Sequence, residues 1–131
     1  TYGAELQMLA ALSSFWSSEL SYARLEDYDG GAYRLTETPK HSLCMVQRLI
    51  FPQDLSLSIS SNYRSKRVSQ DDGGTYHNLQ SYWLHDLALN IPWRKYKLHL
   101  GLENILDENY EGEYGFPEAG RNFAIGLIAE F

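Results

Sequence analysis

The sequence predicts an all-β fold: a segment of an antiparallel transmembrane β-barrel, with about seven strands, short periplasmic turns and long extracellular loops. Three observations predict it. Side-chain hydropathy alternates with a period of two residues, the connections between strands alternate between short and long, and aromatic residues gather near strand ends. Together these features favour strands that cross a bilayer over strands of a water-soluble sandwich.

The two-residue alternation defines the strands. Leu57 and Ile59, for example, alternate with Ser56, Ser58 and Ser60. Successive side chains on a strand point to opposite faces, so this pattern predicts one apolar and one polar face. Good helix formers in the first segment leave a helix as an alternative there, but its alternation favours a strand. The predicted strands lie near residues 2–12, 15–27, 41–51, 54–68, 82–92, 96–106 and 122–131.

The connections differ in length in a regular way. Short ones lie at 12–15, 51–54 and 92–96, and long, Gly-containing or acidic ones lie at 28–40, 69–81 and 107–121. Outer-membrane barrels have short periplasmic turns and long extracellular loops. A tilted strand needs about 9–11 residues to span the bilayer, which agrees with the predicted strands. The long connections are therefore expected outside the cell.

Aromatic residues lie near both ends of the predicted strands. Rings at the two membrane interfaces are typical of outer-membrane barrels. The alternative, that aromatic residues simply favour strands, predicts no clustering at strand ends. Near the short turns lie Phe15, Trp16, Phe51, Trp93, Tyr96 and Phe131, and near the opposite ends lie Tyr22, Tyr63, Trp83 and Phe123.

Composition excludes several classes of protein. The chain has 131 residues, 44% of them hydrophobic and 21% charged, as in an ordinary domain. Its net charge of −6 argues against a broad nucleic-acid-binding surface. No apolar run approaches the roughly 18 residues of a membrane helix. Cys44 is the sole cysteine, so it forms no internal disulfide.

No sequence motif supports catalysis, a cofactor or a metal site. The His-Glu-x-x-His, Gly-x-Ser-x-Gly and Gly-x-Gly-x-x-Gly patterns are absent. Of the four histidines, only His77, in a long loop, is placed to meet a ligand. We therefore expect a protein that is not an enzyme and that holds no resident cofactor or metal ion.

The C-terminal residues resemble the end of TonB-dependent outer-membrane receptors. The resemblance rests on 102–110 (LENILDENY), 114–117 (YGFP) and 119–123 (AGRNF), followed by a last strand that closes on Phe131. Ile105 and Leu106 stand where the family usually has Leu-Phe. The run 110–121 looks closest to vitamin B12 receptors, and siderophore receptors share much of it.

The resemblance implies a larger protein. Receptors of this family have a 22-stranded barrel with a plugged lumen. Residues 1–131 would be the C-terminal part of such a barrel, without the plug domain and the remaining strands. The chain begins at Thr1 without Met, which fits a segment or a mature form. The implied function is TonB-linked uptake of a scarce large solute across the bacterial outer membrane, with the TonB complex contacted through the absent N-terminal region.

Two sets of residues are functional candidates. The last strand is expected to be the signal for the barrel-assembly machinery, with five residues on the lipid face: Phe123, Ile125, Leu127, Ala129 and Phe131. Substrate contact is expected from aromatic and polar residues of the long loops, because rigid rings bury much area at little entropic cost. These residues are Tyr33, Tyr76, His77, Tyr114 and Phe116.

Charged residues near the last loop have structural explanations. Arg121 is expected to form an inward ion pair with Glu103 or Asp107, since a charge facing lipid is costly. The acidic run at 107–118 is expected to be a solvated loop that divalent ions bridge to lipopolysaccharide. Membrane lipid and lipopolysaccharide are therefore the expected surroundings.

Alternatives remain open at this point. A passive pore or a barrel enzyme is one, although paired acidic and histidine residues at the rim are lacking. A soluble lipocalin-like barrel is another, since alternation alone does not say which face is inside. Among solutes, the net negative charge disfavours a strongly anionic ferric siderophore and favours a corrinoid.

Overall fold

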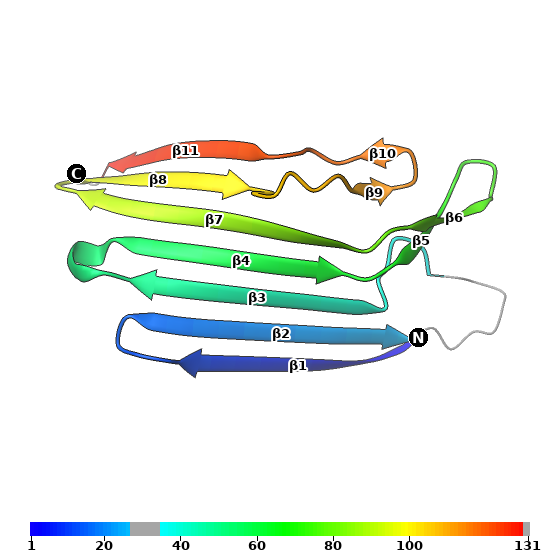
Figure 1. Cartoon of the computed structure of the whole chain (residues 1–131), viewed down its shortest axis with the longest axis horizontal. Coiled ribbons are helices and arrows are strands. Elements are labelled where there is room, and N and C mark those ends of the chain that lie inside the picture. The colour runs from blue at the N-terminus through cyan, green and yellow to red at the C-terminus, as the bar shows by residue number, and fades with distance from the viewer. Residues whose placement is uncertain (27–34, 130–131) are drawn as a thin grey trace.

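One antiparallel sheet dominates the computed structural model, which describes residues 1–26 and 35–129. Each long strand pairs with the next long strand along the chain, so the sheet is a meander (Figure 1). The predicted antiparallel sheet of seven strands is therefore confirmed. The long strands are β1 (Tyr2–Ala11), β2 (Trp16–Glu26), β3 (His41–Ile50), β4 (Ser56–Arg64), β7 (Tyr82–Trp93), β8 (Tyr96–Glu103) and β11 (Asn122–Ala129).

The connections sort by length to the two ends of the sheet, as predicted. The short turns β1–β2, β3–β4 and β7–β8 lie at one end, and the long connections lie at the other (Figure 1). The β3–β4 turn contains a short 3-10 helix, η1 (Pro52–Asp54), in which Gln53 has a φ of 68°. Arg94, in the β7–β8 turn, also has left-handed backbone, with a φ of 58°.

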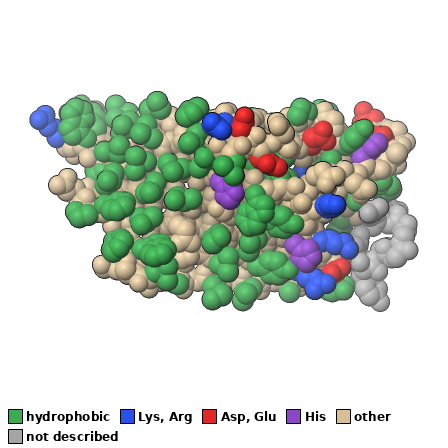
Figure 2. All heavy atoms as spheres, viewed as in Figure 1, with side chains coloured by type: hydrophobic (Ala, Val, Ile, Leu, Met, Phe, Trp, Pro, Cys, Tyr) green, Lys and Arg blue, Asp and Glu red, His purple; other side chains and the backbone are tan. Residues whose placement is uncertain are grey.

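The register separates an apolar face from a polar face. Leu57 pairs with Leu49 and Leu89, and Leu89 pairs with Leu100, which pairs with Ile125. Side chains of directly paired residues lie on the same face, so these leucines and Ile125 form one apolar row across five strands. In the view of Figure 2, hydrophobic side chains cover much of the strands, and charged ones gather mainly toward the long-loop end.

The neighbouring row lies on the opposite face and is polar or small. Ser58 pairs with Arg48 and Ala88, and Ala88 pairs with Gly101. The predicted phase of this strand, Leu57 on the apolar face and Ser58 on the polar one, is therefore confirmed.

Polar side chains on the apolar face bond to one another. The Trp16 indole Nε1 donates to Gln47 Oε1 at 2.8 Å, and Gln47 Nε2 donates to Ser18 Oγ at 2.6 Å. Nearer the long-loop end, Ser61 Oγ and His85 Nδ1 lie 2.8 Å apart. Such pairing satisfies polar groups on an otherwise apolar surface, where unsatisfied donors are costly.

Aromatic side chains occupy both ends of this face. Trp93 and Tyr96 are in ring contact beside a short turn, with centroids 6.3 Å apart. At the other end, Tyr63 and Trp83 have centroids 5.0 Å apart. This is the placement expected of rings at two membrane interfaces. Phe131 lies outside the described residues.

Two predicted strands are shorter than expected, and two long loops contain hairpins. The strand predicted at 54–68 ends at Arg64, and β5 (Arg67–Gln70) then pairs with β6 (Tyr76–Leu79) inside the long connection. The strand predicted at 96–106 ends at Glu103, because Asn104 adopts left-handed backbone with a φ of 50°. The loop that follows contains β9 (Glu111–Glu113) and β10 (Phe116–Pro117).

Burial is concentrated at the long-loop end. Among the described residues, the buried side chains are Arg67, Val68, Ser69, Leu79 and Asn104. Four of these belong to β5 and β6, and the fifth begins the last long loop. The core of this chain therefore lies beside its loops. No helix among the described residues is long and apolar enough to cross a membrane.

Candidate functional site

The long connections pack against one another at one end of the sheet. The backbone N–H of Glu37 donates to the carbonyl of Val68 at 2.7 Å. The Ser69 hydroxyl, fully buried, donates to Glu37 Oε1 at 2.9 Å and accepts the backbone N–H of Tyr114 at 3.0 Å. One hydroxyl therefore joins three connections. We call segments 35–40, 67–79 and 108–118 the loop cluster.

Arg67 is the second joint of the loop cluster. Its Nη2 donates to the backbone carbonyls of Glu111 and Gly112, and its guanidinium lies 4.9 Å from the centroid of the Tyr82 ring. Only 6% of Arg67 is exposed, and its Nη1 is buried without a hydrogen-bond partner in the described part of the chain. Charge-assisted bonds to two carbonyls hold β9 against β5.

Two of the predicted substrate residues come together. The rings of His77 and Tyr114 stack in parallel, with centroids 3.6 Å apart and planes 5° apart. His77 Nε2 also lies 2.9 Å from Asp71 Oδ2. The stack fixes the Tyr114 ring between the two hairpins, so each residue is preorganised by the other loop.

Asp71 organises the β5–β6 turn. Its carboxylate accepts the N–H groups of Gly73 at 3.0 Å and Thr75 at 2.8 Å. The hydrogen bond from His77, followed by that from Thr75, holds the pKa of Asp71 below its ordinary value. The Asp-Asp-Gly-Gly run is therefore a hydrogen-bonded turn, with Gly74 at a φ of 82°.

Two other predicted substrate residues are exposed. Tyr76 is 46% exposed and Phe116 is 66% exposed, each at the outer end of a hairpin strand. Tyr33 lies outside the described residues. The role of all five residues in substrate binding remains a prediction.

Tyr82 and Tyr110, which sequence reasoning missed, form a second aromatic pair. Their ring centroids are 4.4 Å apart, and Arg67 lies over Tyr82. Burial, and then the nearby Glu118 carboxylate, raises the pKa of the Tyr110 hydroxyl. Tyr82 pairs with Arg64, which pairs with Ser42, so it lies on the polar face. The position of Tyr82 on the polar face at a strand end is the feature of the sequence that could have predicted its place in this pair.

The turn after β8 is held by three side chains, those of Asp86, Asn104 and Asp107. Asp86 on β7 accepts the backbone N–H of Asn104 at 2.9 Å, and the Asn104 amide bonds twice to the backbone of Glu108. Asp107 Oδ1 accepts the backbone N–H of Arg121 at 2.8 Å. The ion pair expected for Arg121 is therefore wrong within the described residues. Its backbone, and not its guanidinium, meets Asp107.

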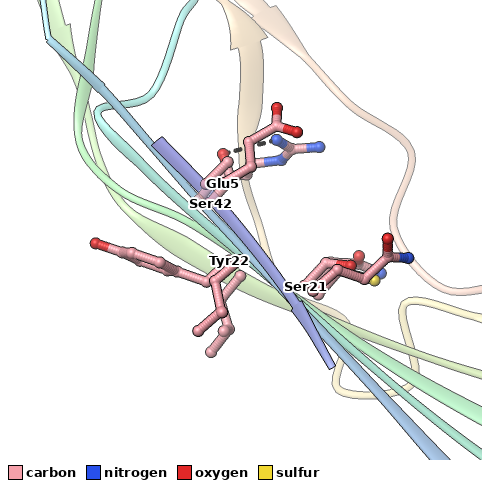
Figure 3. A pocket seen from close by; sticks show the side chains of 11 residues that line it. Glu5, Ser21, Tyr22 and Ser42 are labelled. Carbon is pink, nitrogen blue, oxygen red and sulfur yellow. Dashed lines mark hydrogen bonds between the residues drawn. The ribbon is translucent and has the colours of Figure 1, made fainter. Parts of the chain in front are cut away.

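A hollow of about 320 Å³ lies farther along β1–β4 (Figure 3). Glu5, Ser21 and Ser42 lie on one side of the strands and Tyr22 on the other. Arg64 Nη1 donates to Ser42 Oγ at 2.9 Å. Because its lining residues come from both faces of one sheet, the hollow is not a closed site.

The described residues bring together no catalytic or metal-binding arrangement. No group of three or more His, Cys, Asp or Glu side chains that could hold a metal ion occurs among residues 1–26 and 35–129. His41 bonds to Tyr22, and His99 bonds to Asn90.

The described residues of the proposed assembly signal share one face. Phe123, Ile125, Leu127 and Ala129 pair with Leu102, Leu100, Leu98 and Tyr96 respectively. Phe123 and Ile125 are almost four-fifths exposed. Phe131 lies outside the described residues, and a role in assembly remains a prediction.

Comparison with known proteins gives matches in structure only. No protein-family model and no curated protein sequence matches the chain. The pyoverdine outer-membrane receptor FpvA of Pseudomonas aeruginosa, bound to pyoverdine, superposes with a TM-score of 0.78 and 19% identity over 98% of this chain. The ferric-catecholate import receptor Fiu of Escherichia coli, in its closed form, gives 0.75 and 21% over 95%.

A third receptor gives the same result. The siderophore receptor PiuA of Acinetobacter baumannii superposes with a TM-score of 0.75 and 18% identity over 95% of this chain. The chain covers only about a fifth of each receptor, between 20% and 21% of its length. The resemblance to TonB-dependent receptors is therefore confirmed at the level of the fold: the chain has the architecture of a segment of an outer-membrane receptor β-barrel.

Proposed function

We propose that this chain forms the C-terminal strands of a bacterial outer-membrane receptor that imports a scarce large solute with energy from the TonB system. The observation that carries the proposal is a two-faced meander with its packed loops at one end, in the architecture of three siderophore receptors. The apolar face lies against membrane lipid, and the polar face lines the lumen. The loop cluster lies at the extracellular mouth.

The solute we propose is a ferric siderophore. The three similar structures are receptors for pyoverdine, for ferric catecholates and for siderophores, and none of the three is a corrinoid receptor. The preference for a corrinoid rested on the run 110–121 and on net charge. Net charge opposes only strongly anionic chelates, so we propose a neutral or cationic member of the ferric siderophores.

The partners follow from the same proposal. The plug and the TonB contact lie in parts of the receptor that this chain does not include. The last strand would serve the barrel-assembly machinery through Phe123, Ile125, Leu127, Ala129 and Phe131. The acidic loop at 107–118 would meet lipopolysaccharide through divalent ions.

Uptake by cells tests the function. Bacteria that express the full-length receptor are compared with a deletion strain for accumulation of radiolabelled iron supplied as ferric chelates, and of radiolabelled cyanocobalamin. We expect the deletion to abolish accumulation of at least one chelate, and loss of TonB to have the same effect. Accumulation that persists without TonB contradicts energy-linked transport and favours a passive pore.

Loop variants test the predicted contacts. Tyr76→Ala, Tyr114→Ala and Phe116→Ala should each weaken binding of the transported chelate, with barrel yield unchanged. Tyr114→Ala should have the largest effect because it also releases His77. Unchanged affinity in all three variants with normal folding shows that these rings are structural.

A further inference from the structure

A pocket of about 380 Å³ lies beside the loop cluster, where β7 meets the last long loop. Tyr82, Tyr110 and Tyr114 line it, together with Glu108, Glu111 and Glu118. Tyr82 belongs to the polar face, so the pocket opens on the lumen side of the mouth. Its volume is near the lower limit for small-molecule sites, so it suits one arm of a solute better than a whole ferric chelate.

The carboxylates of this pocket have no cationic partner in the described part of the chain. The ion pairs found there join other residues, and the segment between Lys97 and Arg121 contains no lysine or arginine. Arg67 is the nearest cation, but its Nη2 bonds to backbone carbonyls and its guanidinium covers Tyr82. Three carboxylate residues line the pocket and one guanidinium lies beside it, so the net charge around the pocket is negative.

Glu118 is held at the pocket wall by the shape of β9. Its backbone N–H donates to the carbonyl of Tyr110 at 3.0 Å, and its carboxylate lies over Gly112, where a Cβ atom would collide with it. The absence of a side chain at Gly112 thus lets Glu118 approach Tyr110. The nearby carboxylate contributes to the raised pKa of the Tyr110 hydroxyl.

An organic cation suits these walls better than a metal ion or an anion. No group of three or more metal-binding side chains occurs among the described residues, which disfavours a metal ion. The faces of tyrosine rings attract cations, and carboxylates accept hydrogen bonds from ammonium or guanidinium groups. A polyanionic chelate would be repelled by the same field.

We propose that this pocket binds a protonated amine or guanidinium arm of the imported ferric chelate. The inference rests on the proposed function and narrows its substrate class: Glu111 and Glu118 hold the cationic group, and the Tyr82–Tyr110 pair covers it. The metal centre of the chelate would lie outside the pocket, toward the lumen.

A matched pair of chelates tests the proposal on the purified full-length receptor. Ferrioxamine B carries one protonated primary amine, and its N-acetylated form is the same ferric trihydroxamate without that charge. We expect the receptor to bind ferrioxamine B about tenfold more tightly in a fluorescence-quenching titration, which corresponds to about 1.4 kcal/mol. The preference should decrease with added salt.

Variants locate the preference. The double variant Glu111→Gln/Glu118→Gln should bind the two chelates equally, whereas Glu113→Gln, a matched loss of charge outside the pocket, should keep the preference. Gly112→Ala should reduce the preference for ferrioxamine B, because it displaces Glu118 without changing any charge. This variant tests the pocket even if the double variant fails to fold. Equal binding of both chelates by the native receptor, or binding of neither, overturns the proposal, as does loss of preference in Glu113→Gln.

The uptake experiment distinguishes failure of the pocket assignment from failure of the proposed function. A receptor that imports a ferric chelate but shows no preference for the amine keeps its function and loses this pocket assignment. A receptor that imports no chelate fails at the earlier step.

Discussion

The sheet and the loop cluster obey opposite packing rules. All ten residues of β1 are exposed, and Ile125 on β11, although apolar, is 79% exposed. In the loop cluster, by contrast, Arg67 and Ser69 are buried and hydrogen-bonded although they are polar. The sheet presents apolar surface that lipid would cover, whereas the loop cluster is stabilised by polar contacts within the chain.

The difference shows how a substitution should be judged in each region. In the sheet, the face on which a side chain lies decides the cost, because in the proposed receptor one face meets hydrocarbon and the other meets water. In the loop cluster, the number of hydrogen bonds a side chain makes across loops decides it. The predictions below test these two rules, in order of decreasing effect.

The largest effect is expected from charge on the lipid face. Leu57→Arg places a guanidinium in the apolar row at mid-strand, which costs about 2–4 kcal/mol near the bilayer midplane. Ser58→Arg places the same group on the polar face opposite Arg48, where like-charge repulsion costs under about 1 kcal/mol. Folded receptor in outer-membrane fractions measures both. Equal yields of the two variants would refute the assignment of the faces.

The next effect concerns the joint between the loops. Arg67→Ala removes the bonds to the Glu111 and Gly112 carbonyls and should destabilise docking of β9 by about 1.5–3 kcal/mol. Amide hydrogen exchange in residues 111–117 should then become about tenfold to a hundredfold faster. Lys66→Ala, a change at the exposed neighbouring residue, is the control and should leave exchange unchanged. Native exchange rates in Arg67→Ala would show that the hairpins do not depend on this joint.

The sheet could be predicted because its signal is local and repeated. Alternation in Leu57, Ser58 and Ile59 fixes which face each residue occupies, and a lipid-facing strand needs no specific partner. The same regularity misled at one end: the strand predicted at 54–68 runs past Arg64, where the chain leaves the sheet to form β5. A strand of four residues inside a loop pairs only when the loop adopts the right conformation. The periodicity of the sequence does not predict that conformation.

The loop cluster could be predicted only in part. Exposed rings in long loops identified His77 and Tyr114, but their stacking depends on the docking of two hairpins. Arg67 and Ser69 belong to no motif, and their importance comes from burial, which follows from tertiary packing. The segment from Asn104 to Asp107 carries part of the family resemblance. The structure gives it a physical role, since both residues adopt left-handed backbone and bond to neighbouring segments.

A smaller effect is expected from the ring stack between the two hairpins. His77→Ala and Tyr114→Ala should show a coupling of about 0.5–1.5 kcal/mol in a double-mutant cycle, because their rings are in parallel contact. Local stability measured by hydrogen exchange in β5–β6 and β9–β10 gives the four values. His77 paired with Phe116 is the control, since Phe116 is 66% exposed and no ring contact between these two described residues is found. A coupling near zero for His77 and Tyr114 would show that the stack contributes nothing to docking.

The smallest effect is a dependence of the β5–β6 turn on pH. The folded pKa of Asp71 is held below its ordinary value of 3.8 by the His77 and Thr75 hydrogen bonds. A lowered folded pKa means that the ionised carboxylate favours the turn. Its contribution is therefore complete above the ordinary pKa and is lost as pH falls through the lowered one. Because the carboxylate is partly exposed, solvent screening keeps the contribution small.

Pepsin, which is active in this pH range, measures the loss. Cleavage beside Tyr76, the first aromatic residue after this turn, should accelerate in the detergent-solubilised receptor as pH falls below the ordinary pKa of Asp71. Asp71→Asn removes the carboxylate that binds the N–H groups of Gly73 and Thr75. At about pH 5, above the usual aspartate pKa, this variant should therefore be cleaved faster than native protein. At about pH 2, below that pKa, the two proteins should be cleaved at nearly the same rate. Asp72→Asn, which removes the neighbouring carboxylate, is the control and should be cleaved at the native rate at each pH. Variant and native protein are compared at the same pH, so the pH dependence of pepsin itself cancels. A constant ratio between Asp71→Asn and native protein would mean that ionisation of Asp71 does not hold this turn.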